Sequence, residues 1–138
     1  MTIKFSTIGL WALRILAALI MLQTLYFKFT AAEESVFIFS KIGMEPWGRI
    51  GTGVLELIAS ILILYPKTTA FGALLAIGLM GGALFFHLTK LGIAVKGDGG
   101  QLFIYALLVF VSSTVLALVY KNDFVSPIKK FTSISTIL

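Results

Sequence analysis

The chain has 138 residues, of which 59% are hydrophobic and only 12% are charged, and its mean hydropathy is +1.04. These values exclude an ordinary soluble domain and are typical of an integral membrane protein. The net charge of +5 comes from basic residues scattered over loops and ends, so we expect no nucleic-acid partner. With no cysteine and one histidine, a single copy has no thiolate or His-rich metal site of its own.

Four apolar runs are long enough to cross a hydrocarbon layer of about 30 Å. We expect one domain, residues 1–138, with membrane spans at about 8–29, 49–65, 69–89 and 102–120. The first run is longer than a signal-peptide core and contains Arg14, so we interpret it as a membrane helix. Short turns follow the second and third runs, which predicts antiparallel neighbours.

The predicted fold is therefore an all-α, four-helix membrane bundle with up-down topology. Lysine and arginine are slightly more frequent on the face that bears both termini, which predicts cytoplasmic termini. Residues 31–48 begin acidic and then alternate apolar and polar side chains, as expected for a short segment in the membrane interface. We expect this segment to form a lid over the outer end of the bundle.

One face of each predicted helix is richer in polar or small residues than the rest. These faces contain Arg14, Ala18, Met21, Leu25 and Lys28 in the first helix; Arg49, Gly53, Glu56, Ser60 and Ile63 in the second; Thr69, Ala73, Ala76, Met80, Ala83 and His87 in the third; and Gln101, Tyr105, Leu108, Ser112 and Val119 in the fourth. Because acyl chains favour apolar surface, we expect the four faces to converge on the bundle axis.

Two charged residues are expected deep inside the bundle. Counted at about 1.5 Å per residue from the cytoplasmic helix ends, Arg14 and Glu56 stand at similar heights on antiparallel helices. This predicts a buried Arg14–Glu56 ion pair. The pair either locks the two helices together or forms part of a proton or ligand site, and the sequence leaves both interpretations open.

A second polar group is expected near the outer face, formed by Lys28, Arg49, His87 and Gln101. Four donors around one cavity mouth suit an anionic or carbonyl-bearing head group. The alternatives are that Lys28 and Arg49 extend to the lipid head groups and that His87 makes an interhelical hydrogen bond.

The third helix also carries Gly78 and Gly82 in a GxxxG spacing. This spacing predicts close packing against a neighbouring helix, or alternatively a homodimer contact.

Several segments, in order, resemble the DoxX family of small four-helix bacterial membrane proteins. They are Leu13-Arg14, Lys28, the loop Val36-Phe37-Ile38-Phe39-Ser40-Lys41-Ile42-Gly43-Met44-Glu45-Pro46, Leu55-Glu56-Leu57, Thr68-Thr69 and Phe85-Phe86-His87. The resemblance covers roughly residues 9–120. Two departures predict an altered packing surface near the site: Leu25-Tyr26-Phe27 stands where the family usually has glycines, and Ala59-Ser60 stands where a glycine pair is common.

The resemblance implies membrane-bound redox work, because relatives are associated with quinone-linked thiosulfate oxidation or oxidative-stress assemblies. It favours an accessory subunit of a quinone-linked oxidoreductase in the bacterial cytoplasmic membrane, which binds a quinone while partner subunits supply the electrons. A quinone is therefore the candidate ligand. We expect the chain to have no cofactor of its own, no metal site and no catalytic residue. Two alternatives remain open: a non-enzymatic carrier or binder of a small anion or lipid, and a structural scaffold for partner subunits.

Overall fold

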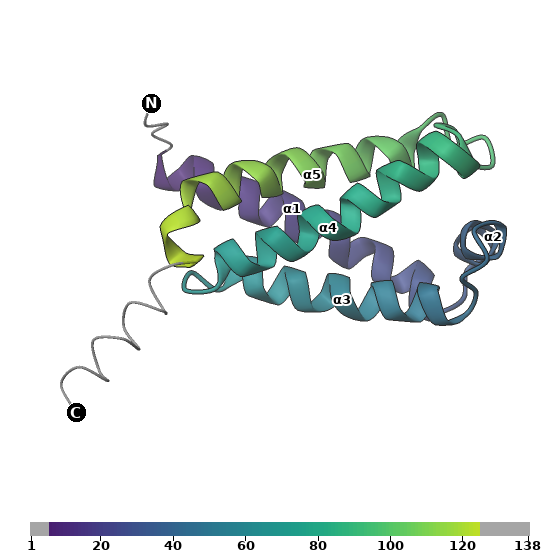
Figure 1. The fold of residues 1–138 in the computed structure, drawn as a ribbon, viewed down its shortest axis with the longest axis horizontal. Coiled ribbons are helices and arrows are strands. Elements are labelled where there is room, and N and C mark those ends of the chain that lie inside the picture. The colour runs from purple at the N-terminus through teal and green to yellow at the C-terminus, as the bar shows by residue number, and fades with distance from the viewer. Residues whose placement is uncertain (1–5, 125–138) are drawn as a thin grey trace.

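The computed structural model describes residues 6–124, which form five α-helices and two short helical turns (Figure 1). The α-helices are α1 (Thr7–Phe29), α2 (Glu33–Lys41), α3 (Trp47–Leu64), α4 (Thr69–Phe86) and α5 (Gln101–Val119). A π-helical turn, η1 (His87–Leu91), continues α4, and a 3-10 turn, η2 (Lys121–Phe124), follows α5. The described part of the chain contains no strand, so the predicted all-α class is confirmed.

Four helices are long and apolar enough to cross a membrane: α1, α3, α5, and α4 together with η1. Their bounds lie within two residues of the predicted spans. Large apolar side chains cover the outside of the bundle, and Leu19, Leu74 and Val111 are each more than half exposed. Such a surface is stable against acyl chains and not against water. The chain is therefore a multi-pass membrane protein.

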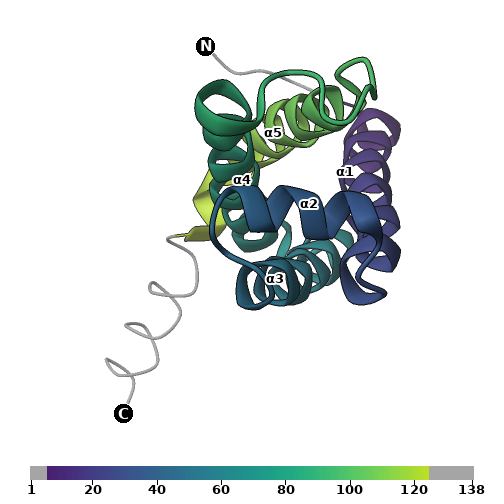
Figure 2. The same ribbon diagram turned by 90° about the vertical axis from the view of Figure 1, so that its right-hand side faces the viewer.

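The bundle consists of two helix pairs that diverge from one end to the other. Helices α1 and α3 pack against each other, as do α4 and α5. The two pairs meet at the end where α3 turns into α4, and they separate toward the opposite end (Figure 1). Helix α2 lies across that wider end (Figure 2). The predicted interfacial segment is thus a short amphipathic helix, with Ser35 and Phe39 buried.

Gly72 lies at the closed end, where the backbones of α3 and α4 approach most tightly. A Cβ atom on Gly72 would lie 2.6 Å from the Ile63 amide nitrogen and 2.9 Å from the Ala59 carbonyl oxygen. Thr69 strengthens the same contact, because its hydroxyl donates to the Ile63 carbonyl oxygen at 3.1 Å. Only a residue without a side chain fits this helix crossing.

Replacing Gly72 with alanine is expected to lower the free energy of unfolding by about 1–3 kcal/mol, because the new methyl group meets backbone atoms that cannot rotate away. The matched control is Gly78→Ala in the same helix, where a Cβ has nothing within 4 Å. The control should be neutral or stabilising by up to about 1 kcal/mol. Thermal melting of both variants in detergent checks this, and equal melting temperatures would contradict it.

The predicted inner faces are largely correct for three helices and wrong for the fourth. All five predicted residues of α3 are buried, as are four of the five in α1. In α5, however, Gln101 and Leu108 are exposed, whereas Val109 and Leu116 are buried. Helix α5 is almost uniformly apolar, so its few polar residues do not mark the buried face. The buried face of α5 is therefore offset from the predicted face by about one residue.

The expectation of close packing at Gly78 and Gly82 is wrong. Both glycines are exposed, and a Cβ atom on either would have nothing within 4 Å. They lie where α4 has diverged from α3, so they border open space instead of a neighbouring helix. A homodimer contact through this face stays a prediction.

Candidate functional site

A cavity of about 450 Å³ lies between the diverging helix pairs and is lined in part by α2. Its volume falls within the range of about 300–1,000 Å³ that is typical of small-molecule sites. Most of the lining is apolar, and α2 contributes Ser35, Ile38 and Phe39 to it. The polar residues of the lining are Gln23, Thr24, Lys28, Glu34, Ser35, Thr52, Glu56, His87, Asp98, Gln101 and Tyr105. Such a cavity suits an apolar ligand that carries a few polar atoms.

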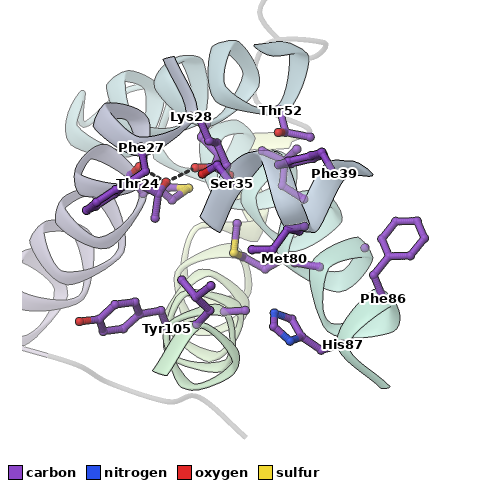
Figure 3. Close-up of a pocket in the computed structure, with 18 of the residues that line it drawn as sticks. Thr24, Phe27, Lys28, Ser35, Phe39, Thr52, Met80, Phe86, His87 and Tyr105 are labelled. Carbon is purple, nitrogen blue, oxygen red and sulfur yellow. Dashed lines mark hydrogen bonds and ion pairs between the residues drawn. The ribbon is translucent and has the colours of Figure 1, made fainter. Parts of the chain in front are cut away.

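The first polar cluster stands on the α1–α3 side of the cavity. Lys28 and Glu56 form an ion pair, with side chains only 14% and 4% exposed. The Thr24 hydroxyl, one turn before Lys28, donates to Glu56 Oε2 at 2.7 Å (Figure 3). Burial of both charges is tolerated because each has its opposite partner and further hydrogen bonds. Free N–H groups of the Lys28 ammonium remain for a ligand.

The predicted Arg14–Glu56 ion pair is wrong, because Glu56 pairs with Lys28 instead. Side chains on a helix lean toward its N-terminus. On the antiparallel helices α1 and α3, Arg14 and Glu56 therefore lean away from each other, whereas Lys28 and Glu56 lean together. The prediction also assumed that the cytoplasmic ends of α1 and α3 are level. The contacts of Arg49 with Lys28 and of Glu56 with Thr24 instead place Glu56 nearer the C-terminal end of α1.

Arg14 lies outside the cavity, near the closed end of the bundle. Its side chain donates to the Tyr120 hydroxyl at 2.6 Å, and its guanidinium stands over the Trp11 and Tyr120 rings at 4.5 and 5.0 Å. The residue is 3% exposed, and its Nε has no partner among the described residues. These contacts join α1 to the end of α5, which favours a structural role.

Tyr120→Phe is expected to lower the free energy of unfolding by about 1–3 kcal/mol, because it leaves the buried guanidinium without its hydrogen bond. Ligand binding in the cavity should stay unchanged, since Arg14 and Tyr120 do not line it. Thermal melting and ligand titration on the same protein check both parts. A loss of binding without a loss of stability would contradict the structural role.

Arg49 does not reach the cavity either. Its Nε donates to both oxygens of Glu45, at 2.8 and 3.0 Å, and its guanidinium also donates to the Lys28 carbonyl oxygen. Arg49 thus holds the C-terminal end of α1 against the start of α3. Of the four residues predicted at the mouth, Lys28, His87 and Gln101 line the cavity, and Arg49 positions the helix that carries Lys28.

The second polar cluster lies across the cavity, on the α4–α5 side (Figure 3). His87 begins the π-helical turn η1 and is 5% exposed. Its Nδ1 lies 2.9 Å from the Gly92 carbonyl oxygen, and its ring meets the Phe103 ring edge-on at 5.7 Å. Short π-helical turns occur frequently at functional sites, because they redirect side chains. Here the turn ends at Gly92, whose φ of +81° favours glycine.

Asp98 fixes the loop between η1 and α5 and also lines the cavity. Its carboxylate accepts from the backbone N–H groups of Val95, Gly100 and Leu102 at 2.9, 2.8 and 3.3 Å. Burial raises the pKa of Asp98, but these three hydrogen bonds and the nearby His87 hold it below its ordinary value of 3.8.

Because the folded pKa of Asp98 lies below the unfolded one, its stabilisation is complete well above pH 3.8 and is lost as the pH falls through the folded pKa. Asp98→Asn should therefore melt at a lower temperature than the parent protein at neutral pH. The difference should shrink in acid, below pH 3.8. Melting curves of both proteins between neutral and acidic pH measure it, and a difference that is constant with pH would contradict the assignment.

Helix α2 is held over the cavity by the loop that contains Asp98. Lys96 donates to Glu33 at 3.0 Å, and its ammonium lies 5.0 Å from the centre of the Phe37 ring. Both Glu33 and Phe37 belong to α2. The contacts are exposed, so each contributes little to stability.

Sequence reasoning missed Thr24, Thr52 and Asp98 as lining residues. Thr24 was within reach, because it precedes Lys28 by one helical turn and therefore shares its face. Asp98 lies in the short turn that was predicted after the third run, and no sequence pattern shows that this turn closes a cavity.

One comparison with known proteins gave a match. A sequence model described as the DoxX-like family matches residues 12–112, which run from within α1 to within α5 and include every residue of the cavity lining. No curated protein matched the chain, and neither did any solved structure. Since the match spans well over half of the sequence, the chain belongs to the DoxX-like family.

Proposed function

We propose that the protein is an accessory subunit of a quinone-linked membrane oxidoreductase and that it binds the quinone in the cavity between the helix pairs. The single observation that carries this proposal is the form of the cavity: mostly apolar walls with one polar cluster on each of two facing sides. A quinone ring is apolar on its faces and carries oxygens at opposite edges. In the proposed complex, Lys28 and His87, one from each cluster, would meet those two edges.

The location of the cavity also supports a lipid-soluble ligand. It lies among membrane-spanning helices, and the exposed glycines Gly78 and Gly82 form part of its lining. An isoprenoid tail needs an exit of this kind toward the acyl chains. When bound, the quinone would supply the redox chemistry, and partner subunits would supply or remove the electrons. The chain's own residues would hold and orient the ring and keep water from it.

The charges of the cavity argue against the carrier of a small anion. Glu34, Glu56 and Asp98 line it, and Lys28 is its sole lysine or arginine among the described residues. Lys28 is moreover neutralised by Glu56. A neutral ligand with polar oxygens fits this charge balance better than an anion does. If the protein is instead a structural scaffold, the cavity binds no ligand. Ligand titration distinguishes a scaffold from a quinone-binding subunit.

We also propose in which membrane the protein lies and how it is oriented there. The lysine distribution favours cytoplasmic termini, so α2 and the cavity would lie at the outer side of a bacterial cytoplasmic membrane. A homodimer through Gly78 and Gly82 would cover the exposed part of the cavity lining, and redox-partner subunits are the other candidates for that surface.

Thermal melting of the purified protein with a series of quinones tests the proposal. A ligand that binds only the folded state stabilises it by about 2.7 kcal/mol at a hundred times its dissociation constant. We expect a concentration-dependent rise in melting temperature with at least one short-tailed benzoquinone or naphthoquinone. An alcohol with the same tail and no ring is the control. No rise with any quinone, or an equal rise with the alcohol, would contradict quinone binding.

A further inference from the structure

The direction of the hydrogen bond between His87 and Gly92 fixes the polarity of the histidine ring. His87 Nδ1 lies 2.9 Å from the Gly92 carbonyl oxygen. A carbonyl oxygen only accepts, so Nδ1 carries the hydrogen and donates it. In the neutral ring, Nε2 then has a lone pair and no hydrogen. His87 Nε2 is therefore a hydrogen-bond acceptor.

This acceptor is available to a ligand in the cavity. His87 is 5% exposed and lines the cavity, and no described residue bonds to its Nε2. Phe103 contacts the ring edge-on and provides no hydrogen bond. Figure 3 shows the imidazole across the cavity from Thr24 and Lys28. Nε2 is not one of the fully buried side-chain atoms without a partner in the described part of the chain, so it is open to the cavity, where a donor on the ligand can bond to it.

Of the described residues, no polar side chain on the α4–α5 side of the cavity is only a donor, since the Asp98 carboxylate accepts. The Gln101 amide and the Tyr105 hydroxyl bond to each other at 2.8 Å, and both can reverse donor and acceptor roles. On the facing side, Lys28 donates while the Glu56 oxygens accept, so either kind of ligand oxygen finds a partner there.

A neighbouring backbone carbonyl sets the role of His87. It does the same for the Thr24 and Thr52 hydroxyls, which donate to the Met21 and Gly48 carbonyl oxygens.

We propose that His87 makes the cavity selective for the reduced, hydroxyl-bearing form of its ligand: a quinol donates its hydroxyl hydrogen to Nε2, whereas the corresponding quinone presents a second acceptor there. The inference rests on the proposed function and adds to it which redox form is held. Gly92 is the positioning residue, because its carbonyl keeps the hydrogen on Nδ1.

Anaerobic titration of the full-length protein tests the selectivity. A short-tailed benzoquinol, the corresponding benzoquinone and the dimethyl ether of the quinol are compared in one alkaline buffer, which favours the neutral ring. We expect the quinol to bind about tenfold more tightly than the quinone or the ether, which is the effect of one well-placed hydrogen bond. Equal binding of quinol and quinone, or tighter binding of the quinone, would overturn the selectivity and leave the proposed function standing. Binding of none of the three would overturn both.

His87→Gln provides the matched variant, because its amide can turn to offer either an oxygen or an N–H group. The preference for quinol should fall to about equal affinity while binding is retained. A variant that retains the full preference would overturn the role of His87. The comparison of the three ligands on the parent protein needs no variant, so the proposal stays testable if His87→Gln does not fold.

Discussion

Replacing Lys28 with methionine is expected to lower the free energy of unfolding by about 3–5 kcal/mol, because it leaves the Glu56 carboxylate buried without its counter-charge. Glu56→Met should have an effect of similar size for the mirror-image reason. Both side chains are largely removed from bulk water, so water replaces the lost partner poorly. Thermal or denaturant unfolding in detergent measures the two effects.

The double variant Lys28→Met/Glu56→Met separates stability from binding. Removing both charges should restore most of the lost stability, since an apolar pair of similar volume fits a dry interior. Ligand binding should remain impaired, because the donor on this side of the cavity is gone. The control is Lys96→Met, which breaks an exposed ion pair and should change stability by about 1 kcal/mol or less. Full recovery of binding in the double variant would show that the pair is only a helix lock.

Filling the cavity with Gly82→Leu is expected to abolish quinone binding while the protein stays folded. A Cβ on Gly82 has nothing within 4 Å, and Gly82 lines the cavity, so the leucine side chain would occupy the space of the ligand. The replacement of glycine by leucine also favours the helix by roughly 1 kcal/mol. The affinity for quinone should fall by at least about a hundredfold, since bulk in the ligand's place removes most of its contacts.

Gly51→Leu is the matched control for this variant. Gly51 is also an exposed helical glycine with nothing within 4 Å of its Cβ, but it does not line the cavity. It should therefore bind quinone like the parent protein. Titration of both variants with the same quinone measures the contrast. Equal binding by Gly82→Leu and Gly51→Leu would place the ligand elsewhere.

Much of the fold follows from the sequence because bilayer thickness and helix period constrain it. The four spans, the amphipathic segment and the inner face of α3 could all be predicted in this way. The inner face of α5 could not, because acyl chains and a protein interior accept the same aliphatic residues. Only Ser112 among its predicted polar residues marks the buried side.

The site was less predictable because it depends on direction and on chain distortions. Lys28, Glu56 and His87 are evident as costly charges or titratable groups in apolar helices, and all three line the cavity. The partner of Glu56 was predicted wrongly, because side chains lean toward the N-terminus of their own helix and this direction helps to decide which charges meet. The divergence of the helix pairs and the π-helical turn at His87 have no local sequence pattern, and these two features create the cavity and fix the histidine.

The central claim is that the space between the diverging helix pairs holds a lipid-soluble quinone. Mass spectrometry of the small molecules that remain bound after gentle purification tests it most directly, with Gly82→Leu prepared in parallel. The account predicts a quinone bound to the parent protein and absent from Gly82→Leu. A parent protein that retains only phospholipid, or a variant that retains as much quinone as the parent, would contradict it.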